Sequence, residues 1–419
     1  MQSYLQYVEN TEPPVIFHRW SLLTAIGALL ERNVFYGHDY FTYYPNLYVM
    51  LLGESGTRKS TAINLAKKTL QQTGYNTFSA EKTSKEKYLQ DLADTHDDID
   101  SDITFAEIFG NDGNGNLRDD RITPNFIVAG EFNDFIGNGN IEFMSILGNL
   151  WDWNGGPYEN RIKTGKSIKI PNPTISILGG NTATGLNLSF PPHAIGQGFF
   201  SRLILVHSAA SERRIRNPVL PAIDIASMLR EVRERVKGKL GSTQTAERLL
   251  DAIYERSTPI PDTRFASYST RRHTQLMKLI VICAAMDLSM EITEDHVLLA
   301  NTILCHAEQL MPTALGEFGR ARSSDISHSV LQFVNSRKQM STPADLWEAF
   351  SQDLESATQM HDIIFKLLSS GKMVSTTVNV QGTKVVGFLG VNNAITVEDS
   401  TNEFVDFNLL TEEERNMKK

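Results

Sequence analysis

The sequence is poor in cysteine and lacks long apolar runs. Its two cysteines, Cys283 and Cys305, lie in apolar helical patterns away from any CxxC or histidine-rich spacing, so we expect two small core residues and neither a disulfide nor a zinc site. No apolar run approaches the roughly 20 residues that cross a bilayer, and no signal-peptide pattern opens the chain. These absences predict a cytoplasmic protein with no membrane partner.

The chain also lacks an excess of cations, since 40 Lys and Arg against 49 Asp and Glu give its 419 residues a net charge of −9. This balance argues against a surface that is basic all over, as a protein that coats duplex DNA would have. It does not exclude nucleic acid, because a ring-shaped motor can confine its cations to a central channel. With 41% hydrophobic and 21% charged residues, the composition predicts two or three packed domains.

The first half of the chain reads as a leader and an α/β core. Residues 1–45 are the leader, with helical spacing over 20–30 and then two short aromatic strands at 34–36 and 41–44. Residues 46–217 are the core, where apolar strands alternate with helical or loop segments; the expected strands are 47–52, 77–80, 126–129, 174–178 and 203–207. This alternation predicts a mostly parallel, doubly wound sheet. Residues 96–123 are rich in Asp, Asn and Gly and are predicted to form a mobile insertion.

The second half of the chain is mostly helical. Helical spacing over 223–239, 245–256, 270–288 and 293–310 predicts an α-helical lid at 218–315 that ends near Pro312. Residues 324–390 then give helices at 326–337, 343–350 and 357–369 and strands at 373–380 and 383–389, which is the order of a winged helix-turn-helix. Such domains bind DNA or serve as protein docks. Residues 391–419 are acidic with scattered Phe and Leu and are expected to be a flexible or partner-binding tail.

The strongest motif lies between the strand at 47–52 and the helical pattern at 61–70. Backbone N–H groups of such a glycine loop wrap phosphates, Lys59 can reach the β and γ phosphates, and Ser60 can ligate magnesium. Arg58 stands where the usual pattern has glycine, so its side chain must point away from the phosphates or add a contact to them. The motif predicts ATP and Mg²⁺ as ligands, bound by Gly53, Glu54, Ser55, Gly56, Thr57, Arg58, Lys59, Ser60 and Thr61.

Hydrolysis of a bound nucleotide needs a carboxylate at the end of a neighbouring strand. Glu131 follows the strand at 126–129 and is the predicted water-positioning and metal-site residue, with Asp134 as an alternative. The aspartate expected before Glu131 is absent, because Gly130 stands there, which leaves magnesium more dependent on Ser60 and water. Asn181 follows the strand at 174–178 and is a candidate γ-phosphate sensor, or else a turn or helix-cap residue.

Cations elsewhere suggest a second subunit and a nucleic acid. Arg202 could reach the ATP of a neighbouring subunit as an arginine finger, or form a surface salt bridge. An alternating segment between Trp151 and Pro171 can form a hairpin that lines the channel of a ring and contacts DNA phosphates without reading sequence. A solvated surface hairpin is the alternative; its predicted nucleic-acid residues are Arg161, Lys163, Lys166 and Lys169.

Over residues 14–310 the chain resembles the phage and plasmid replicative ATPases that are often fused to primases. The resemblance is carried by Arg58 in the loop, Glu131, Gly-Gly-Asn181, Gly-Phe-Phe-Ser-Arg202 and the helical region that follows; only the glycine loop is specific by itself. Ser201-Arg202-Leu and the stretch from Ser269-Thr-Arg271-Arg272 to Ile292-Thr-Glu-Asp-His296 are similar to the minichromosome maintenance helicases. In that family the serine-arginine pair supplies the finger, and an arginine that opens a lid helix is a second sensor, which implies these roles for Arg202 and for Arg271 or Arg272. Gly130 departs from that family's metal site.

These resemblances imply an AAA+-like core in a homo-oligomer, expected to be a hexamer, in the cytoplasm of a host cell. The leading hypothesis is an ATP-driven DNA helicase in replication of a phage or mobile element, acting on single-stranded or forked DNA, with a primase as a further partner. The second is a helicase loader or initiator that binds DNA without unwinding it. The third is a structural or defence-related ATP-binding protein that has lost turnover.

Overall fold

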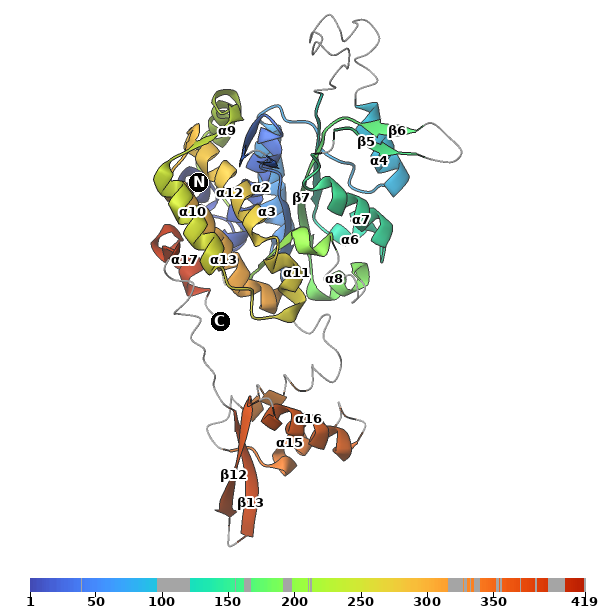
Figure 1. Cartoon of the computed structure of the whole chain (residues 1–419), viewed down its shortest axis with the longest axis vertical. Coiled ribbons are helices and arrows are strands. Elements are labelled where there is room, and N and C mark those ends of the chain that lie inside the picture. The colour runs from blue at the N-terminus through green and yellow to red at the C-terminus, as the bar shows by residue number, and fades with distance from the viewer. Residues whose placement is uncertain are drawn as a thin grey trace, which may run out of the picture. The chain divides into compact units, whose positions relative to one another are not determined.

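The computed structural model describes residues 1–38, 40–95, 121–154, 156–161, 167–190, 198–209, 211, 213–315, 327, 330–331, 333–334, 340–351, 354, 356–369, 371–380, 383–390 and 404–417. The chain forms two compact units (Figure 1): unit 1 comprises residues 1–316 and 403–419, and unit 2 comprises residues 317–402. The predicted insertion at 96–123 lies almost wholly outside the described residues.

Unit 1 is built on a four-stranded parallel sheet, which confirms the predicted α/β class. Its strands lie in the order β4-β7-β3-β8 and comprise β3 (Tyr48–Leu52), β4 (Thr123–Ala129), β7 (Pro173–Asn181) and β8 (Leu203–His207). All five residues of β3 are buried, as its uninterrupted apolar sequence requires in a sheet covered on both faces. The expected strand at 77–80 contributes one parallel bridge, between Phe78 and Phe126.

Helices cover both faces of this sheet. A Cβ added at Gly180 would lie 3.3 Å from Ile63 of α3 (Lys59–Gln71), whereas one at Gly179 would lie 3.1 Å from Phe132 of α6 (Phe132–Ile136). Successive residues of a strand point to opposite faces, so α3 and α6 lie on opposite sides. Packed with α3 is α2 (Val15–Leu30), and near α6 are α7 (Ile141–Leu150) and α8 (Ala183–Ser189). Because all four strands are parallel, the loops after their carboxyl ends gather at one edge.

The remaining elements of unit 1 pack around this sheet. A small sheet in the order β2-β1-β9 joins the predicted leader to the second half of the chain. On the other side, β5 and β6 pair in antiparallel register, which confirms the predicted hairpin before β7. These elements are α1 (Gln2–Val8), β1 (Val34–His38), β2 (Phe41–Tyr43), α4 (Lys85–Asp94), β5 (Tyr158–Asn160), β6 (Ile168–Ile170) and β9 (Gly238–Lys239).

The predicted lid helices form, but they belong to the same compact unit as the sheet. They include α9 (Ile225–Arg235), α10 (Gln244–Arg256), α11 (Ala266–Ser269), α12 (Arg272–Met286) and α13 (Glu294–Leu315), with a two-stranded sheet of β10 (Gly241–Ser242) and β11 (Glu291–Ile292). The last of them, α13, ends at Leu315, the predicted end of the lid; it contains Pro312 and buries Met311, Ala314 and Leu315 around it. No helix in the described ranges has the length and hydropathy to cross a bilayer.

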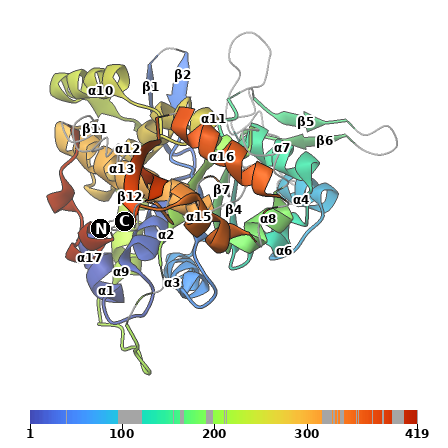
Figure 2. The same ribbon diagram turned by 90° about the horizontal axis from the view of Figure 1, so that it is seen from below.

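The last described segment corrects the expectation of a flexible acidic tail. Residues 404–417, with α17 (Glu412–Asn416), pack on unit 1, and Figure 2 shows α17 near α1 and α2. Arg19 donates from Nε and from a terminal nitrogen to the two carboxylate oxygens of Glu414, at 2.5 and 2.6 Å, with both side chains buried. The acidic composition of this segment predicted solvated side chains, but Glu414 is paired with Arg19 inside the fold.

Unit 2 has its own small core. It contains α15 (Pro343–Phe350), α16 (Ala357–Ser369) and an antiparallel pair of β12 (Met373–Val380) and β13 (Thr383–Gly390). Thr342 and Asp345 form a capping box at the start of α15, and Pro343 occupies its first turn. Apolar side chains from both helices and both strands meet in the core, among them Leu346, Ile363, Leu367, Met373 and Phe388.

Candidate functional site

The glycine loop connects β3 to α3 at the carboxyl edge of the sheet. Gly53 fits only as glycine, since a Cβ there would lie 2.7 Å from the Ser208 carbonyl oxygen. Gly56 has φ +90°, and the Thr57 hydroxyl donates to the Glu54 carbonyl at 2.9 Å. The loop is therefore a compact turn held against the end of β8.

Lys59 places its ammonium group inside this loop. Its Nζ donates to the carbonyl oxygens of Gly53 and Glu54 at 2.7 and 3.0 Å and to Thr57 Oγ1 at 3.2 Å, and the residue is 5% exposed. Burial lowers the pKa of Lys59, and the Glu131 and Glu54 carboxylates oppose that shift. The three acceptors are uncharged, so a phosphate oxygen would be a stronger partner for the same ammonium group.

Arg58 points away from Lys59. Its backbone is left-handed, with φ 62° and ψ 26°, where glycine is normally favoured. Its Nε donates to Glu12 Oε2 at 2.6 Å, and the side chain is 55% exposed. Of the two options that the sequence left open, the structure has the side chain directed outward.

Ser60, Gly130 and Glu131 meet beside the loop. A Cβ at position 130 would lie 3.3 Å from Ser60 Oγ, so an aspartate there would reach a cation held by Ser60, whereas glycine supplies no ligand. Glu131 is the residue before α6 but makes no side-chain capping hydrogen bond; it is exposed, and its carboxylate favours the charged form of Lys59. The structure thus brings together Lys59, Ser60 and Glu131 at one edge of the sheet, although β7 lies between β3 and β4, so the strands that they follow are not the neighbours that the sequence predicted.

The protein oxygens beside the loop fit a magnesium ion whose other ligands are water and the phosphates of a bound substrate. Within the described ranges, no three His, Cys, Asp or Glu side chains gather into a ready-made metal site. Magnesium usually keeps several waters and takes one or two protein oxygens together with substrate phosphates. The exposed Ser60 hydroxyl can serve as that protein ligand.

Asn181 lies at the same edge but is already engaged. It pairs with Leu52 across β7 and β3 and is fully buried. Its Nδ2 donates to Asn133 Oδ1 at 2.7 Å, and its Oδ1 accepts from Thr182 N at 2.9 Å. Asn133, which the sequence reasoning missed, also donates to the Gly185 carbonyl at 2.9 Å. The sequence signal for Asn133 was weak, because an asparagine at the start of a helix is ordinary.

A basic cleft of about 430 Å³ opens beside the loop, a volume typical of small-ligand sites. Its arginines after β8 were not singled out from the sequence, although Arg213-Arg214-Ile215-Arg216 is a local basic run. Glu12 accepts from Ile215 N at 2.9 Å, and this bond together with Arg58 lowers the pKa of Glu12. The cleft is lined by Glu12, Gly56, Arg58, Ser211, Arg213, Arg214, Ile215 and Arg216.

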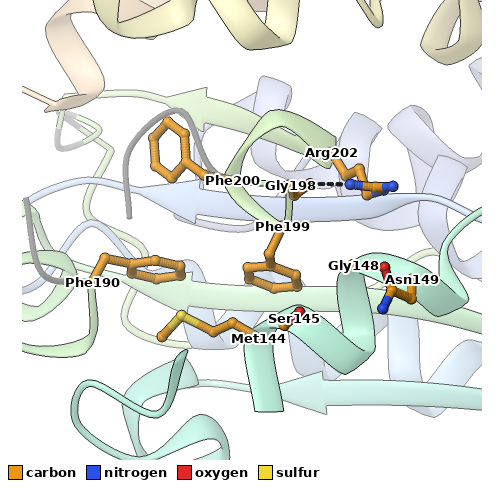
Figure 3. A pocket seen from close by; sticks show the side chains of 9 residues that line it. All are labelled: Met144, Ser145, Gly148, Asn149, Phe190, Gly198, Phe199, Phe200 and Arg202. Atoms are coloured by element: carbon orange, nitrogen blue, oxygen red, sulfur yellow. Dashed lines mark hydrogen bonds between the residues drawn. The ribbon is translucent and has the colours of Figure 1, made fainter. Parts of the chain in front are cut away.

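Arg202 lies at the opposite edge of the sheet. Leu203 pairs with Tyr48 and His207 with Leu52, which puts Arg202 five residues, or roughly 17 Å at about 3.3 Å per residue, from the loop end of β3. It is 9% exposed, donates to the Gly198 carbonyl oxygen and faces the Trp151 ring at 5.8 Å. Burial, reinforced by Arg271, lowers its pKa. Figure 3 shows Arg202 at a small cavity of about 70 Å³, lined also by Met144, Phe190 and Phe199.

The two sensor candidates at the start of α12 differ sharply. Arg272 is buried and donates to Glu308 Oε2 at 2.9 Å, Asn301 Oδ1 at 2.8 Å and Cys305 Sγ at 3.1 Å, so it joins α12 to α13. Arg271 is partly exposed and acts electrostatically on Arg202. The contacts of Arg272 are all with α13 and none is with the described glycine loop, and of the two arginines only Arg271 is partly exposed.

The hairpin of β5 and β6 presents part of the predicted basic set. Arg161 is 81% exposed and lies 3.0 Å from Glu159, and Lys169 is exposed and pairs across the strands with Glu159. Lys163 and Lys166 lie outside the described residues. Within the described part of the hairpin, Glu159 therefore offsets some of the positive charge.

No protein-family model and no curated protein sequence matches this chain. Its function must therefore be argued from the site itself, where a buried ammonium group, a hydroxyl and an exposed carboxylate converge on a glycine loop.

Proposed function

We propose that this protein is an ATPase with an AAA+-like P-loop core that uses hydrolysis to do work on a nucleic acid. The observation that carries the proposal is the enclosure of Lys59 Nζ by the loop oxygens of Gly53, Glu54 and Thr57, next to Ser60. A buried cation with only neutral partners is suited to an incoming polyanion. The adjacent basic cleft offers room for the nucleoside part of ATP.

The residues divide the work of hydrolysis among themselves. Backbone N–H groups of the loop and Lys59 would bind the β and γ phosphates, and Ser60 would hold magnesium. Magnesium supplies charge neutralisation on the phosphates when bound. Glu131, exposed at the start of α6, would orient the attacking water and accept its proton.

Two features support nucleic acid as the target. The β5–β6 hairpin carries Arg161 and Lys169, with Lys163 and Lys166 between them in sequence. In unit 2, two helices followed by a strand pair agree with part of a winged helix-turn-helix. The leading form of the proposal is a hexameric DNA helicase of a phage or mobile element, in which Arg202 of a neighbouring copy completes each ATP site.

A helicase loader or initiator is the second candidate. Arg202 is 9% exposed and faces Trp151, so acting as a finger would require it to leave these contacts. Gly130 offers no carboxylate to the metal. Both observations favour slow, assembly-dependent turnover, which suits a switch better than a motor.

The test of the ATP site compares Lys59→Ala with Lys68→Ala, which removes an exposed lysine from the same helix. Binding of a fluorescent ATP analogue should be lost in the first and retained in the second. Glu131→Gln should keep binding but slow phosphate release by about 100-fold or more. Unchanged binding by Lys59→Ala would contradict the proposal.

Strand displacement on forked DNA separates the two candidates. A variant with Lys163 and Lys166 changed to alanine should lose unwinding but keep ATPase activity if the hairpin grips DNA. DNA-stimulated ATPase without any unwinding by the native chain would favour the loader.

A further inference from the structure

We propose that Glu413, in the segment that follows unit 2, is a positioning residue for Arg213, and that Arg213 contacts the nucleotide in the basic cleft. The inference rests on the proposed ATP site and adds a new component to it. The chain would complete its nucleotide site with residues that lie about 350 positions after the glycine loop in sequence, by the numbers of Lys59 and Glu413.

The contact between the two residues is direct. An Arg213 terminal nitrogen lies 2.7 Å from Glu413 Oε2, and the other donates to the Glu9 carbonyl oxygen at 3.0 Å. The guanidinium group is thus held from two sides in the wall of the cleft. Because an arginine has five N–H donors, these two contacts leave others to offer to a ligand.

Glu413 is itself fixed at both oxygens. Its Oε1 accepts from Val15 N at 2.9 Å, at the start of α2. Pro14, the residue before α2, gives no side-chain cap, so Glu413 supplies the missing acceptor from a distant part of the chain. A carboxylate at this helix terminus is also favoured by the helix dipole.

The neighbouring residues make this placement rigid. Glu414 forms the buried ion pair with Arg19, and Thr411 and Glu414 form a capping box at the start of α17. Further along, Asn301 donates to the Phe404 carbonyl at 2.7 Å, and Thr302 accepts from Asp406 N at 3.1 Å. The segment is therefore anchored along its length, so the position of Glu413 does not depend on its partly exposed contact with Arg213 alone.

The cleft explains why an arginine must be positioned there. Its wall contains Arg58, Arg213, Arg214 and Arg216, and Gly56 connects it to the loop. Arg58 is committed to Glu12, whereas Arg214 and Arg216 are exposed. Unrestrained guanidinium groups would repel one another, and a preorganised one loses less freedom when a nucleotide binds. Glu413 supplies the charge that holds Arg213 in place.

The test uses the full chain and compares Glu413→Gln with Glu412→Gln, an exposed neighbour on the same helix. Glu413→Gln should raise the KM for ATP and the Kd for a fluorescent ATP analogue by roughly tenfold, with kcat within about twofold, because lost positioning weakens ground state and transition state alike. Arg213→Ala should do the same, and the double variant should be no worse than either single variant, since both remove one interaction.

Three outcomes separate the possibilities. A Glu413→Gln variant with the same KM as Glu412→Gln overturns the inference, and so do KM effects of Glu413→Gln and Arg213→Ala that multiply in the double variant. A native chain that binds no ATP refutes the proposed function instead. Should Glu413→Gln misfold, Arg213→Ala decides the question, because Arg213 is 39% exposed and its removal leaves no buried charge.

Discussion

At the scale of single residues, Lys278 is a cation buried in the core of unit 1. The residue is 1% exposed, and its Nζ donates to Asn46 Oδ1 at 2.7 Å and to the carbonyl oxygens of Tyr44 and Trp151 at 3.2 and 3.3 Å. Burial lowers its pKa to about 7, with Asp152 opposing the shift and Arg32 and Arg202 adding to it. Its charge therefore changes near neutral pH only in the folded state.

This shift predicts a pH dependence of stability. An unfolded lysine has a pKa of about 10.4, so between about pH 7 and 10 the unfolded chain binds more protons, and the free energy of unfolding must rise with pH. Relative to Lys278→Met, the native chain should gain about 2 kcal/mol between pH 7 and pH 9. Urea unfolding at both pH values measures the difference. Equal changes in the two proteins would show that Lys278 does not titrate in this range.

The residues that the sequence could predict are those that follow strands. Lys59, Ser60 and Glu131 come together because parallel strands bring their carboxyl ends to one edge, and Gly130 lies beside Ser60 for the same reason. Arg213 could not be found in this way. Its partner Glu413 lies in a segment whose acidic composition indicates only solvation, and no local periodicity links the two.

At the scale of elements, Arg272 joins the two longest helices of the second half of unit 1. It contacts Glu308, Asn301 and Cys305 of α13, and the Tyr268 hydroxyl donates to the other oxygen of Glu308 at 3.1 Å. Burial opposes the charge of Arg272, but Glu308 and Cys305 outweigh burial and raise its pKa. The role that the geometry supports is structural.

Adjacent arginines provide the test of that role. Arg272→Ala leaves Glu308 buried without its partner and should lower the free energy of unfolding by about 3–5 kcal/mol. Arg271→Ala, at a partly exposed position, should change it by less than about 0.5 kcal/mol. Urea denaturation of both variants measures the effect. A small loss for Arg272→Ala would reopen its candidacy as a sensor.

Element boundaries followed local signals where these were strong. The helices at 343–350 and 357–369 form as predicted, because periodicity and capping agree there. β7 instead extends through Gly179, Gly180 and Asn181, which the sequence placed after the strand. A Cβ at Gly180 would lie 2.5 Å from the Gly130 carbonyl oxygen, so these glycines serve close packing within the strand and do not form a turn.

At the scale of the whole molecule, the two units have separate cores and should unfold separately. Trp20, Trp151 and Trp153 belong to unit 1, and Trp347 belongs to unit 2. Urea unfolding followed by tryptophan fluorescence should show two transitions, because a small domain buries a smaller share of its surface and is less stable. In Trp347→Phe the fluorescence should report one transition while far-UV circular dichroism reports both. Coincident transitions by both probes would contradict independent units.

The pairing of Arg19 with Glu414 also bears on how the protein is made. The two residues are 395 positions apart, so a ribosome that adds about 5–20 residues per second would need roughly 20 to 80 seconds to supply the second after the first. During that interval α2 carries an arginine destined for burial that has no carboxylate to receive it. Until Glu414 emerges, the buried position of Arg19 lacks its counter-charge, and an emerging chain that a chaperone shields at α2 should reach the folded state in higher yield.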